Sequence, residues 1–294
     1  MKLAVIGSNG QLGTDLMEVL SLEHDVTGLN HNDIEITDIN SVRNALSAVK
    51  PSILLNTAAY HIVPEAEKFP EKAFQINGIG ALNLAKVSQE LGIRLVHYST
   101  DYVFDGAKQK PYTEDDRPNP LSVYANTKLS GEYFALNYCE RSYVIRVSGI
   151  YGKVPCRAKG GNFITTMIKL ANEKPEVRVV NDEILTPTPT NDIAKNTAAL
   201  INTDAFGLYH MSCEGEVSWY EFAKVIWETL QLKTPLYAAS VKDFPLVVKR
   251  PFYSVLENKN LNKLGINQMP QWKEALKKFL VSEVKSNNYP TVSS

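Results

Sequence analysis

The chain has 294 residues, with 31 lysines and arginines against 32 aspartates and glutamates, so its net charge at neutral pH is -1. This balance excludes the basic surface that nucleic acid or an anionic membrane requires, and it favours a small molecule as partner. No apolar run approaches the roughly 20 residues of a membrane span, and the N-terminus turns glycine-rich too soon for a secretory signal, so we expect a cytoplasmic protein. Cys139, Cys156 and Cys213 lie far apart and predict neither a disulfide framework nor a zinc site.

Short β-branched segments alternate with longer helical patterns in the first half of the chain. The predicted strands cover residues 3–6, 25–29, 53–56, 94–99 and 143–147. The predicted helices cover residues 11–20, 39–49, 70–91 and 122–137. Alternation of this kind predicts an α/β fold with a Rossmann-type doubly wound parallel sheet, whose ligand lies at the carboxyl ends of the strands.

The regular alternation ends after residue 152. We expect a helix near 162–171, a strand at 207–211, a helix at 218–230 and an amphipathic helix near 271–279. A chain of this length is near the size at which a second lobe forms. We therefore predict an NAD(P)-binding Rossmann domain over 1–151 and a smaller C-terminal α/β substrate-binding lobe over 152–286, partly interleaved with the first. Residues 287–294 are predicted to be a flexible tail.

A glycine-rich loop follows the first predicted strand directly and opens the first predicted helix. Gly7, Gly10 and Gly13 have the spacing of a dinucleotide-binding turn. In such a turn the first glycine permits the tight bend, the second admits a pyrophosphate, and the third lets helix and sheet pack closely. The helix N-terminus adds a partial positive charge. A glycine-rich turn without a ligand is the alternative, but the strand before it and the helix after it favour a coenzyme site.

The end of the second predicted strand bears on the choice of coenzyme. It reads Gly-Leu-Asn-His-Asn at 28–32, without an acidic residue at its tip, where a carboxylate would hold the ribose hydroxyls and repel a 2′-phosphate. This favours NADPH. No arginine stands there to pair with the phosphate, so NADH remains an alternative. Glu35 and Ile36 are candidates to flank the adenine, although an exposed polar turn explains them nearly as well.

Tyr124 and Lys128 are the candidates for acid-base chemistry. They lie four residues apart on a predicted helix, so both side chains point to one face. A free tyrosine has a pKa of about 10, and we expect a nearby lysine ammonium to lower it. The same spacing recurs at Tyr220 and Lys224, but only Tyr124 follows a strand that ends in hydroxyl residues. A buried tyrosine beside a solvated lysine is the alternative interpretation of the pair.

Ser99, Thr100 and Asp101 end the strand that precedes this helix. A hydroxyl at this position can hydrogen-bond a substrate carbonyl, and we choose Thr100 for this role with Ser99 as the alternative. Serine and threonine at strand ends are also common as caps of turns and helices, so either one alone is a weak signal.

Further segments carry a resemblance to a known family. They are residues 56–60 (Asn-Thr-Ala-Ala-Tyr), Asn77 with 83–85 (Asn-Leu-Ala), 99–106 (Ser-Thr-Asp-Tyr-Val-Phe-Asp-Gly), 124–132 (Tyr-Ala-Asn-Thr-Lys-Leu-Ser-Gly-Glu) and 250–254 (Arg-Pro-Phe-Tyr-Ser). Together with the glycine loop they resemble the extended short-chain dehydrogenase/reductases, and more narrowly the dTDP-4-dehydrorhamnose reductase family, over nearly the whole chain. The resemblance implies NADPH-dependent reduction of the C4 ketone of a nucleotide-linked 4-keto-6-deoxysugar, as in dTDP-rhamnose biosynthesis.

The resemblance also implies roles for individual residues. Tyr124 would deliver a proton to the C4 oxygen, Lys128 would tune it and hold the nicotinamide ribose, and Thr100 would polarise the carbonyl. The coenzyme-binding set, besides Tyr124 and Lys128, would be Gly7, Asn9, Gly10, Gln11, Leu12, Gly13, Asn30, Glu35, Ile36, Thr57, Ala58, Ala59, Tyr60, Asn77, Ser99 and Val147. The substrate-binding set would be Thr100, Asp101, Tyr102, Tyr124, Gly149, Asn162 and Arg250. No acidic cluster predicts a bound metal.

Other functions within the wider superfamily stay open. The chain has Val147-Ser148-Gly149 where the rhamnose-forming enzymes usually carry Thr-Ser-Trp, which leaves the identity of the sugar undecided. The family also resembles the regulatory beta subunit of methionine adenosyltransferase, which would bind NADP without turnover. A nucleotide-sugar epimerase is a further alternative, whereas Tyr102 after Asp101 disfavours a dehydratase. A homodimer is the expected assembly.

Overall fold

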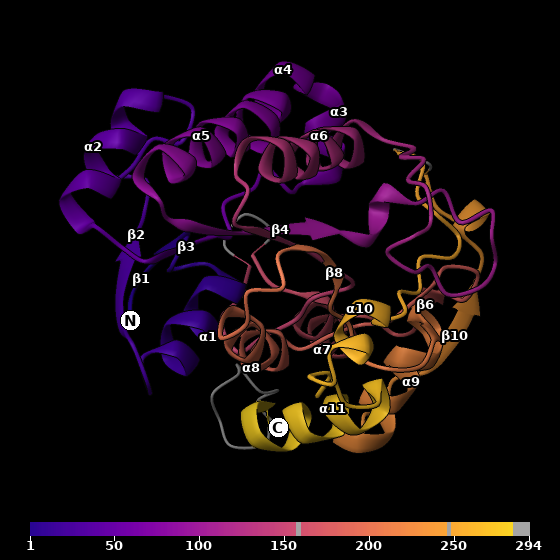
Figure 1. Ribbon diagram of the computed structural model, residues 1–294. Coiled ribbons are helices and arrows are strands. Elements are labelled where there is room, and N and C mark those ends of the chain that lie inside the picture. Colours follow the sequence, from indigo (N-terminus) through magenta and orange to yellow (C-terminus); the bar gives the residue numbers. More distant parts are fainter. Residues whose placement is uncertain (157–159, 246–247, 285–294) are drawn as a thin grey trace.

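A six-stranded, entirely parallel sheet forms the centre of the molecule (Figure 1). The structure is a computed structural model that describes residues 1–156, 160–245 and 248–284. The strand order is β2-β1-β3-β4-β5-β8. The strands are β1 (Lys2–Ile6), β2 (Asp25–Leu29), β3 (Ile53–Asn56), β4 (Arg94–Thr100), β5 (Ser142–Val147) and β8 (Gly207–His210). The order reverses between β1 and β3, and in open sheets of this kind ligands bind beside that switch point.

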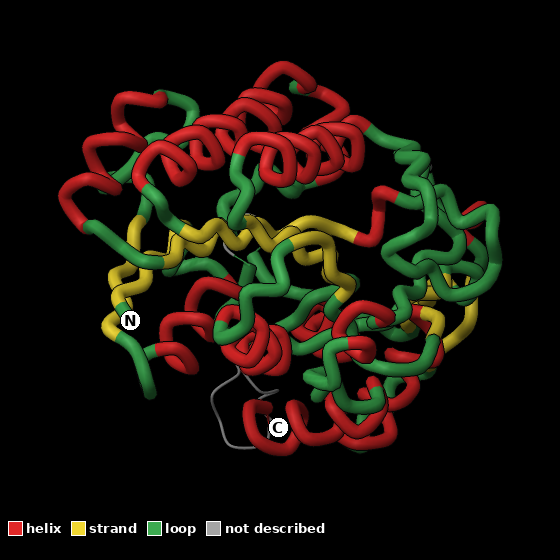
Figure 2. Tube along the Cα trace, viewed as in Figure 1, coloured by secondary structure: helices red, strands yellow, loops and turns green. Residues whose placement is uncertain are grey.

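Helices cover both faces of the sheet (Figure 2). One face carries α2 (Ile39–Val49), α5 (Ala81–Leu91) and α6 (Val123–Tyr138), whereas α1 (Gln11–Leu20) and α8 (Thr190–Ile201) pack against the other. Because both faces are covered, the central strands β1, β3, β4 and β5 are buried along most of their length and not at alternate residues, and their apolar runs identified them in the sequence. The sequence therefore predicted the α/β class and the doubly wound sheet correctly.

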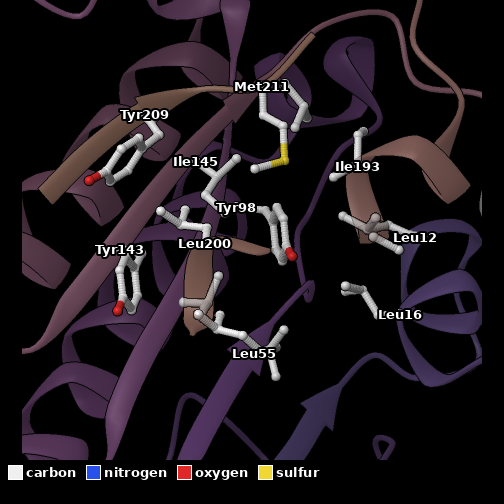
Figure 3. Close-up of a cluster of buried hydrophobic side chains, with 14 of the residues drawn as sticks. Leu12, Leu16, Leu55, Tyr98, Tyr143, Ile145, Ile193, Leu200, Tyr209 and Met211 are labelled. Carbon is white, nitrogen blue, oxygen red and sulfur yellow. The ribbon is translucent and has the colours of Figure 1, made fainter. Parts of the chain in front are cut away.

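The core beneath α1 and α8 contains a polar link between the sheet and α8. Tyr98 lies in the middle of this cluster, with Leu12 and Leu16 on one side and Ile145 and Leu200 on the other (Figure 3). The phenol oxygen of Tyr98 hydrogen-bonds the Thr197 hydroxyl at 2.8 Å, so the buried polar group is satisfied. Strand β4 is thereby fixed to α8.

The single helix predicted over 70–91 is wrong in its middle. The structure has α4 (Pro70–Phe74), then a π-helical segment over Gln75–Gly80, and only then α5. The widened turn brings the Asn77 carbonyl against α6, where a Cβ on Gly131 would lie 2.5 Å from that oxygen. A hydrophobic period does not distinguish an α turn from an inserted π turn, so the pattern could not reveal this segment. The short helix α3 (Val63–Lys68) was not predicted either.

Most of the remaining chain forms a smaller lobe with its own apolar core. Its elements are α7 (Phe163–Glu173), β6 (Val177–Val180), β7 (Ile184–Leu185), β9 (Val217–Ser218), α9 (Trp219–Leu230), β10 (Leu236–Ala239) and α11 (Trp272–Phe279). Helix α10 (Lys259–Lys263) packs on β8, and its Leu261 belongs to the core of the central sheet. Strands β6 and β10 pair in parallel, and α7, α9 and α11 pack around a second hydrophobic cluster. The domain boundary after residue 151 stays a prediction, since β8 and α8 from the second half of the chain pack with the first. The predicted tail at 287–294 lies outside the described residues.

A buried ion pair joins α6 to the sheet. The Arg146 guanidinium on β5 donates from Nη2 to Glu132 Oε2 at 2.7 Å and from Nε to Oε1 at 2.9 Å. The side chains are 2% and 1% exposed, and the Ser99 hydroxyl also donates to Glu132, at 2.5 Å.

None of the helices within the described ranges combines the length and the hydrophobicity that a membrane span needs.

Replacement of Glu132 by glutamine is expected to destabilise the fold strongly. It leaves the Arg146 charge buried without a carboxylate, which should lower the free energy of unfolding by about 3 kcal/mol or more. The matched control is Glu90→Gln, which removes an exposed partner of Arg43 and should cost less than about 1 kcal/mol. Denaturant unfolding of the three proteins measures both effects, and equal costs would contradict this account of the ion pair.

Candidate functional site

The glycine loop lies at the carboxyl end of β1, beside the switch point. Gly7 has φ +75°, and its N–H donates to the Leu29 carbonyl at 2.9 Å, which ties the loop to β2. A Cβ on Gly13 would lie 2.1 Å from the Gly7 carbonyl oxygen, so only glycine lets α1 approach the strand this closely. Helix α1 begins at Gln11 after Gly10, which supplies no side-chain cap. Its first amide groups are therefore available to an anion.

The segment after β3 lies against this loop. The Thr57 hydroxyl donates to the Ile6 carbonyl at 2.7 Å, and a Cβ on Gly7 would lie 2.6 Å from that hydroxyl oxygen. Farther along, the Asn77 amide binds both backbone groups of Tyr60, accepting from its N–H at 2.8 Å and donating to its carbonyl at 3.0 Å. Residues 57–60 are thus held as a fixed wall beside the glycine loop. Ala58 and Ala59 belong to this wall.

At the tip of β2 the structure reveals a carboxylate that the sequence analysis did not place there. Asp33 Oδ2 accepts from the Asn30 N–H at 2.8 Å, while Asn30 Oδ1 accepts from the Ser8 hydroxyl at 3.2 Å. Residues 28–32 themselves carry no carboxylate, but a turn brings a residue three positions beyond Asn30 back to the strand end. Glu35 is exposed and accepts from Thr37, whereas Ile36 is buried.

Tyr124 and Lys128 lie on the face of α6 that is turned toward β4. Ser122 caps the helix by accepting from the Ala125 N–H at 3.3 Å, which places Tyr124 in the first turn. Its ring is only partly buried and meets the Tyr102 ring edge to face, with centroids 6.2 Å apart. The Lys128 ammonium is 3% exposed and donates to the Tyr98 carbonyl at 2.6 Å. The Tyr124 side chain is therefore partly accessible, whereas the Lys128 ammonium is buried against β4.

The pKa values of this pair differ from the sequence-based expectation. Burial raises the pKa of Tyr124 to about 12, an effect that an interaction with the Thr100 hydroxyl partly offsets and the charge of Asp101 reinforces. Burial also lowers the pKa of Lys128 to about 8, against the opposing effect of the Glu132 carboxylate. The expected lowering of the tyrosine pKa by Lys128 is wrong: loss of hydration is the largest effect on each group, and the two groups that modify it at Tyr124 are Thr100 and Asp101.

Asp101 joins three segments behind the two tyrosines. Its carboxylate accepts from the hydroxyls of Thr100 at 3.1 Å, Ser148 at 2.9 Å and Ser254 at 2.6 Å. The side chain is 3% exposed, and burial raises its pKa to about 6 although the three hydroxyls act to lower it. The ends of β4 and β5 are in this way tied to the segment around residue 254. The sequence analysis named neither Ser148 nor Ser254 for this role.

Arg250 is the positive charge that acts on the substrate side of the site. The positive charge of Arg250 acts on both Tyr102 and Glu183, and Tyr102 in turn contacts Tyr124. Gly149 follows β5 with φ +52°, and a Cβ there would lie 2.9 Å from Leu185 Cδ1, so the backbone and the neighbouring side chain both require glycine.

Some predicted site residues are engaged in contacts within the protein. Ser99 points to Glu132 on the opposite side of β4 from Thr100, and Asn77 Nδ2 also donates to the Thr127 hydroxyl at 3.0 Å. Asn162 caps α7 by accepting from the Thr165 N–H at 3.1 Å, and it donates to the Gly152 carbonyl. These contacts position elements around the site, and direct ligand contacts by these residues stay predictions.

The second tyrosine-lysine pair has a different environment. Tyr220 lies on α9 and packs partly against the core of the smaller lobe, and the Lys224 ammonium is exposed near Glu221 at 3.7 Å. The expectation that only Tyr124 follows a strand ending in a hydroxyl residue is wrong, because β9 ends at Ser218 directly before α9. That hydroxyl caps α9 by accepting from the Glu221 N–H at 3.1 Å, and β9 pairs with β7 outside the parallel sheet. Among the described residues no group of three or more histidine, cysteine, aspartate or glutamate side chains could hold a metal ion.

Asp101→Asn is expected to change the pH dependence of stability. Because the folded pKa of about 6 lies above the ordinary 3.8, the folded chain holds a proton between these values that the unfolded chain has released. The stabilisation is complete at low pH and is lost as the pH rises through the folded pKa. Wild type should therefore lose roughly 2 kcal/mol more than the variant between about pH 4 and pH 7. Denaturant unfolding across this range gives the difference, and identical pH profiles would refute it.

Comparisons with known proteins agree with this geometry. The family described as the RmlD substrate binding domain matches residues 1–284. The chain is 39% identical to the spore coat polysaccharide biosynthesis protein SpsK of Bacillus subtilis, over 95% of this chain and 96% of that protein. It is 32% identical to dTDP-4-dehydrorhamnose reductase of Sinorhizobium fredii, over 95% and 97% of the two chains.

A solved structure is similar over almost the entire length. The crystal structure of dTDP-4-dehydrorhamnose reductase of Bacillus anthracis in complex with NADP superposes with a TM-score of 0.91, at 37% identity, and the match covers 95% of this chain and 98% of that one. This extent of similarity agrees with the glycine loop and with the tyrosine-lysine pair on α6. The chain belongs to the RmlD family of extended short-chain dehydrogenase/reductases.

Proposed function

We propose that this protein is an NADPH-dependent reductase of the C4 ketone of a dTDP-linked 4-keto-6-deoxysugar. The observation that carries the proposal is the placement of Tyr124, Thr100 and Lys128 at the carboxyl edge of the sheet that also presents the glycine loop. The names of the relatives support the substrate class, and the complex of the Bacillus anthracis reductase with NADP supports the coenzyme.

The coenzyme would be held by the glycine loop, the first turn of α1 and the wall at 57–60. Gly7 and Gly13 permit the tight loop and the close approach of α1, and the uncapped amides of α1 supply donors for a pyrophosphate. Gln11 is buried, and its Oε1 has no hydrogen-bond partner in the described chain, so this orphaned acceptor fits a site that a ligand completes. When bound, NADPH supplies the hydride for the carbonyl carbon.

Tyr124 would donate the proton that completes the reduction. A pKa of about 12 keeps the phenol protonated at neutral pH, so it is always in the donor form. An alkoxide that develops on the C4 oxygen is a stronger base than the phenolate, and the proton therefore moves from the tyrosine oxygen to the sugar oxygen. The Thr100 hydroxyl would orient the same carbonyl oxygen. Carbon and oxygen each gain one hydrogen, and the ketone becomes a secondary alcohol.

Lys128 would stabilise the phenolate that remains. Its ammonium is fixed by the Tyr98 carbonyl and is shielded from solvent, so its charge acts in a medium of low polarity. Glu132, one turn farther along α6, favours the charged form of the lysine. Tyr124, Lys128 and Glu132 follow one another at intervals of four residues along one face of α6. The carboxylate favours the charged lysine, and the charged lysine would stabilise the phenolate.

The finer aspects of the assignment are part of the same proposal. Arg250 would bind the phosphate groups of the nucleotide sugar, and the space beside Gly149 would receive the sugar ring. A cytoplasmic location and a homodimer are expected. Tyr102, whose ring meets Tyr124, would form one wall of the substrate pocket.

Tyr124→Phe tests the proton donor directly. We expect kcat for oxidation of NADPH with dTDP-4-keto-6-deoxyglucose or dTDP-4-dehydrorhamnose to fall by about 10²–10⁴-fold. The affinity for NADPH should change little, since the ring is kept. Tyr220→Phe is the matched control and should retain full activity. If wild type binds NADPH but none of several 4-keto sugars accelerates its oxidation, the reductase is excluded and a regulatory, coenzyme-binding protein is favoured.

Asp33→Asn tests the coenzyme preference. The Asp33 carboxylate at the tip of β2 is placed to repel a 2′-phosphate, so its neutralisation should tighten NADPH by about two- to fivefold. NADH carries no such phosphate, and its affinity should not increase. Asp25→Asn, at the other end of the same strand, is the control. Fluorescence titrations of both coenzymes provide the ratio, and equal changes for NADPH and NADH would place the adenosine ribose elsewhere.

A further inference from the structure

Cys156 and His61 form a thiol-imidazole pair that the mechanism above does not use. Nε2 of His61 lies 3.0 Å from the Cys156 sulfur, although the two positions are 95 residues apart in the sequence. Both side chains are partly exposed. The other two cysteines, Cys139 and Cys213, are each 1% exposed, and burial raises the pKa of both thiols. Their thiolate forms are therefore disfavoured, and Cys156 is the cysteine that a reagent in solution can reach.

The second ring nitrogen of His61 sets the direction of this hydrogen bond. Nδ1 lies 3.2 Å from the Ala59 carbonyl oxygen, and because a carbonyl only accepts, Nδ1 carries the proton of the neutral ring. Nε2 is then the acceptor, and the Cys156 thiol donates to it. A base beside a nucleophile, oriented by a third group, is the arrangement that activates cysteine for attack. The pair is therefore built to pass the thiol proton to the ring and leave a thiolate.

The segment that carries Cys156 begins beside the coenzyme loop. Gly152 lies against the first turn of α1, since an added Cβ would be 3.1 Å from Gln11 Cγ. The next residue, Lys153, pairs through its ammonium with Glu18 on the same helix. Cys156 comes only four residues after Gly152, so the two lie within about 14 Å of each other. The thiol is thus close to the helix start whose amides face the coenzyme.

His61 lies on the other side of the coenzyme site, directly after the wall formed by residues 57–60. The carbonyl that binds its ring belongs to Ala59, a member of the wall, and Asn77 holds Tyr60 between the two. The thiol-imidazole contact therefore connects the segment beside α1 with the wall beside the glycine loop. These are the two sides between which the coenzyme would be held.

We propose that Cys156 is a thiol-modification site with His61 as its base, and that a mixed disulfide formed there with a small disulfide obstructs NADPH binding. The inference rests on the proposed function, because it takes the coenzyme to the glycine loop and to the wall at 57–60. A sulfur in a disulfide has no proton to donate to Nε2, so modification breaks the contact. The attached group then needs room at the edge of the wall, where the coenzyme would lie.

The exchange balances with the small disulfide as the one added reactant. The Cys156 proton moves to His61 Nε2, and the thiolate attacks one sulfur of the small disulfide. A new sulfur–sulfur bond forms as the old one breaks, and the electron pair leaves with the departing sulfur. This sulfur takes the proton from His61 and becomes a thiol. Cys156 is oxidised, the departing half is reduced, and a dithiol reductant reverses the step.

Reaction of the native full chain with the chromogenic disulfide dithiobis(nitrobenzoate) tests the thiol and its base. We expect one thiol per chain to react rapidly in wild type and none to do so in Cys156→Ser. His61→Gln should slow the reaction at least about tenfold, because the base is lost while a side chain of similar length is kept. His24→Gln is the matched control and should react as wild type does, since His24 follows the far end of α1.

NADPH binding tests the position of Cys156. NADPH at about ten times its Kd leaves roughly one chain in eleven without coenzyme, so the thiol should react about tenfold more slowly. In the converse experiment, wild type is converted to its mixed disulfide with glutathione disulfide and checked by intact mass. It should then bind NADPH at least about tenfold more weakly in a fluorescence titration, and dithiothreitol should restore the affinity. Cys156→Ser should keep the affinity of untreated wild type with or without this treatment.

The outcomes separate this inference from the proposed reductase. Rapid reaction in Cys156→Ser, or an unchanged rate in His61→Gln, overturns the assignment of the thiol and its base. Absence of protection by bound NADPH, or unchanged NADPH affinity after modification, overturns the link to the coenzyme site. NADPH oxidation with keto sugars is assayed separately on untreated protein, so the reductase stands when only the inference fails. If untreated wild type binds no NADPH, the proposed function and the link to the coenzyme site fail together.

Discussion

The buried ion pair between Glu132 and Arg146 is the interaction on which the site depends. It fixes α6 against β5 from within, with both side chains almost fully shielded from water. One turn before Glu132 stands Lys128, and one turn before that stands Tyr124, so the rotation of the helix that satisfies the ion pair also sets the direction of the phenol. A pair of this kind contributes little net stability compared with apolar residues, but its geometry admits only one orientation of the helix.

The surrounding layers make this orientation rigid. Gly131 permits close contact between α6 and the π-helical segment over Gln75–Gly80, whose Asn77 side chain holds Tyr60 in place. The wall of the coenzyme site and the helix that carries the acid are therefore fixed by the same contact. Preorganisation of this type lets a site act without rearranging its own dipoles during the reaction.

Sequence reasoning succeeded where one local pattern determines the outcome. The strands of the central sheet were located within one residue because buried apolar runs are typical of a parallel sheet, and the glycine spacing correctly anticipated a loop at the carboxyl end of β1. The short strands β6, β7, β9 and β10 of the smaller lobe were not predicted. It failed where the result depends on burial in the folded chain, on a local change of helix type or on contacts between segments far apart in the sequence. The direction of the Tyr124 pKa depends on how completely the fold removes water, and the π-helical segment leaves no period of its own. The partnership of Asp101 with Ser254 spans 153 residues of chain, and no spacing rule reaches so far.

That long-range partnership has a consequence for how the molecule becomes complete during synthesis. The carboxylate of Asp101 sits at the end of β4, yet the hydroxyl that binds it at 2.6 Å belongs to a residue near the C-terminus. While the ribosome is still adding the second half, strands β1 to β5 are present, but β8, α8 and the partner of the strand end beside Thr100 are not. The first half of the chain therefore gains this contact only after the segment around Ser254 has been synthesised. An N-terminal fragment that ends before Ser254 would contain the glycine loop but would lack this hydrogen bond to Asp101.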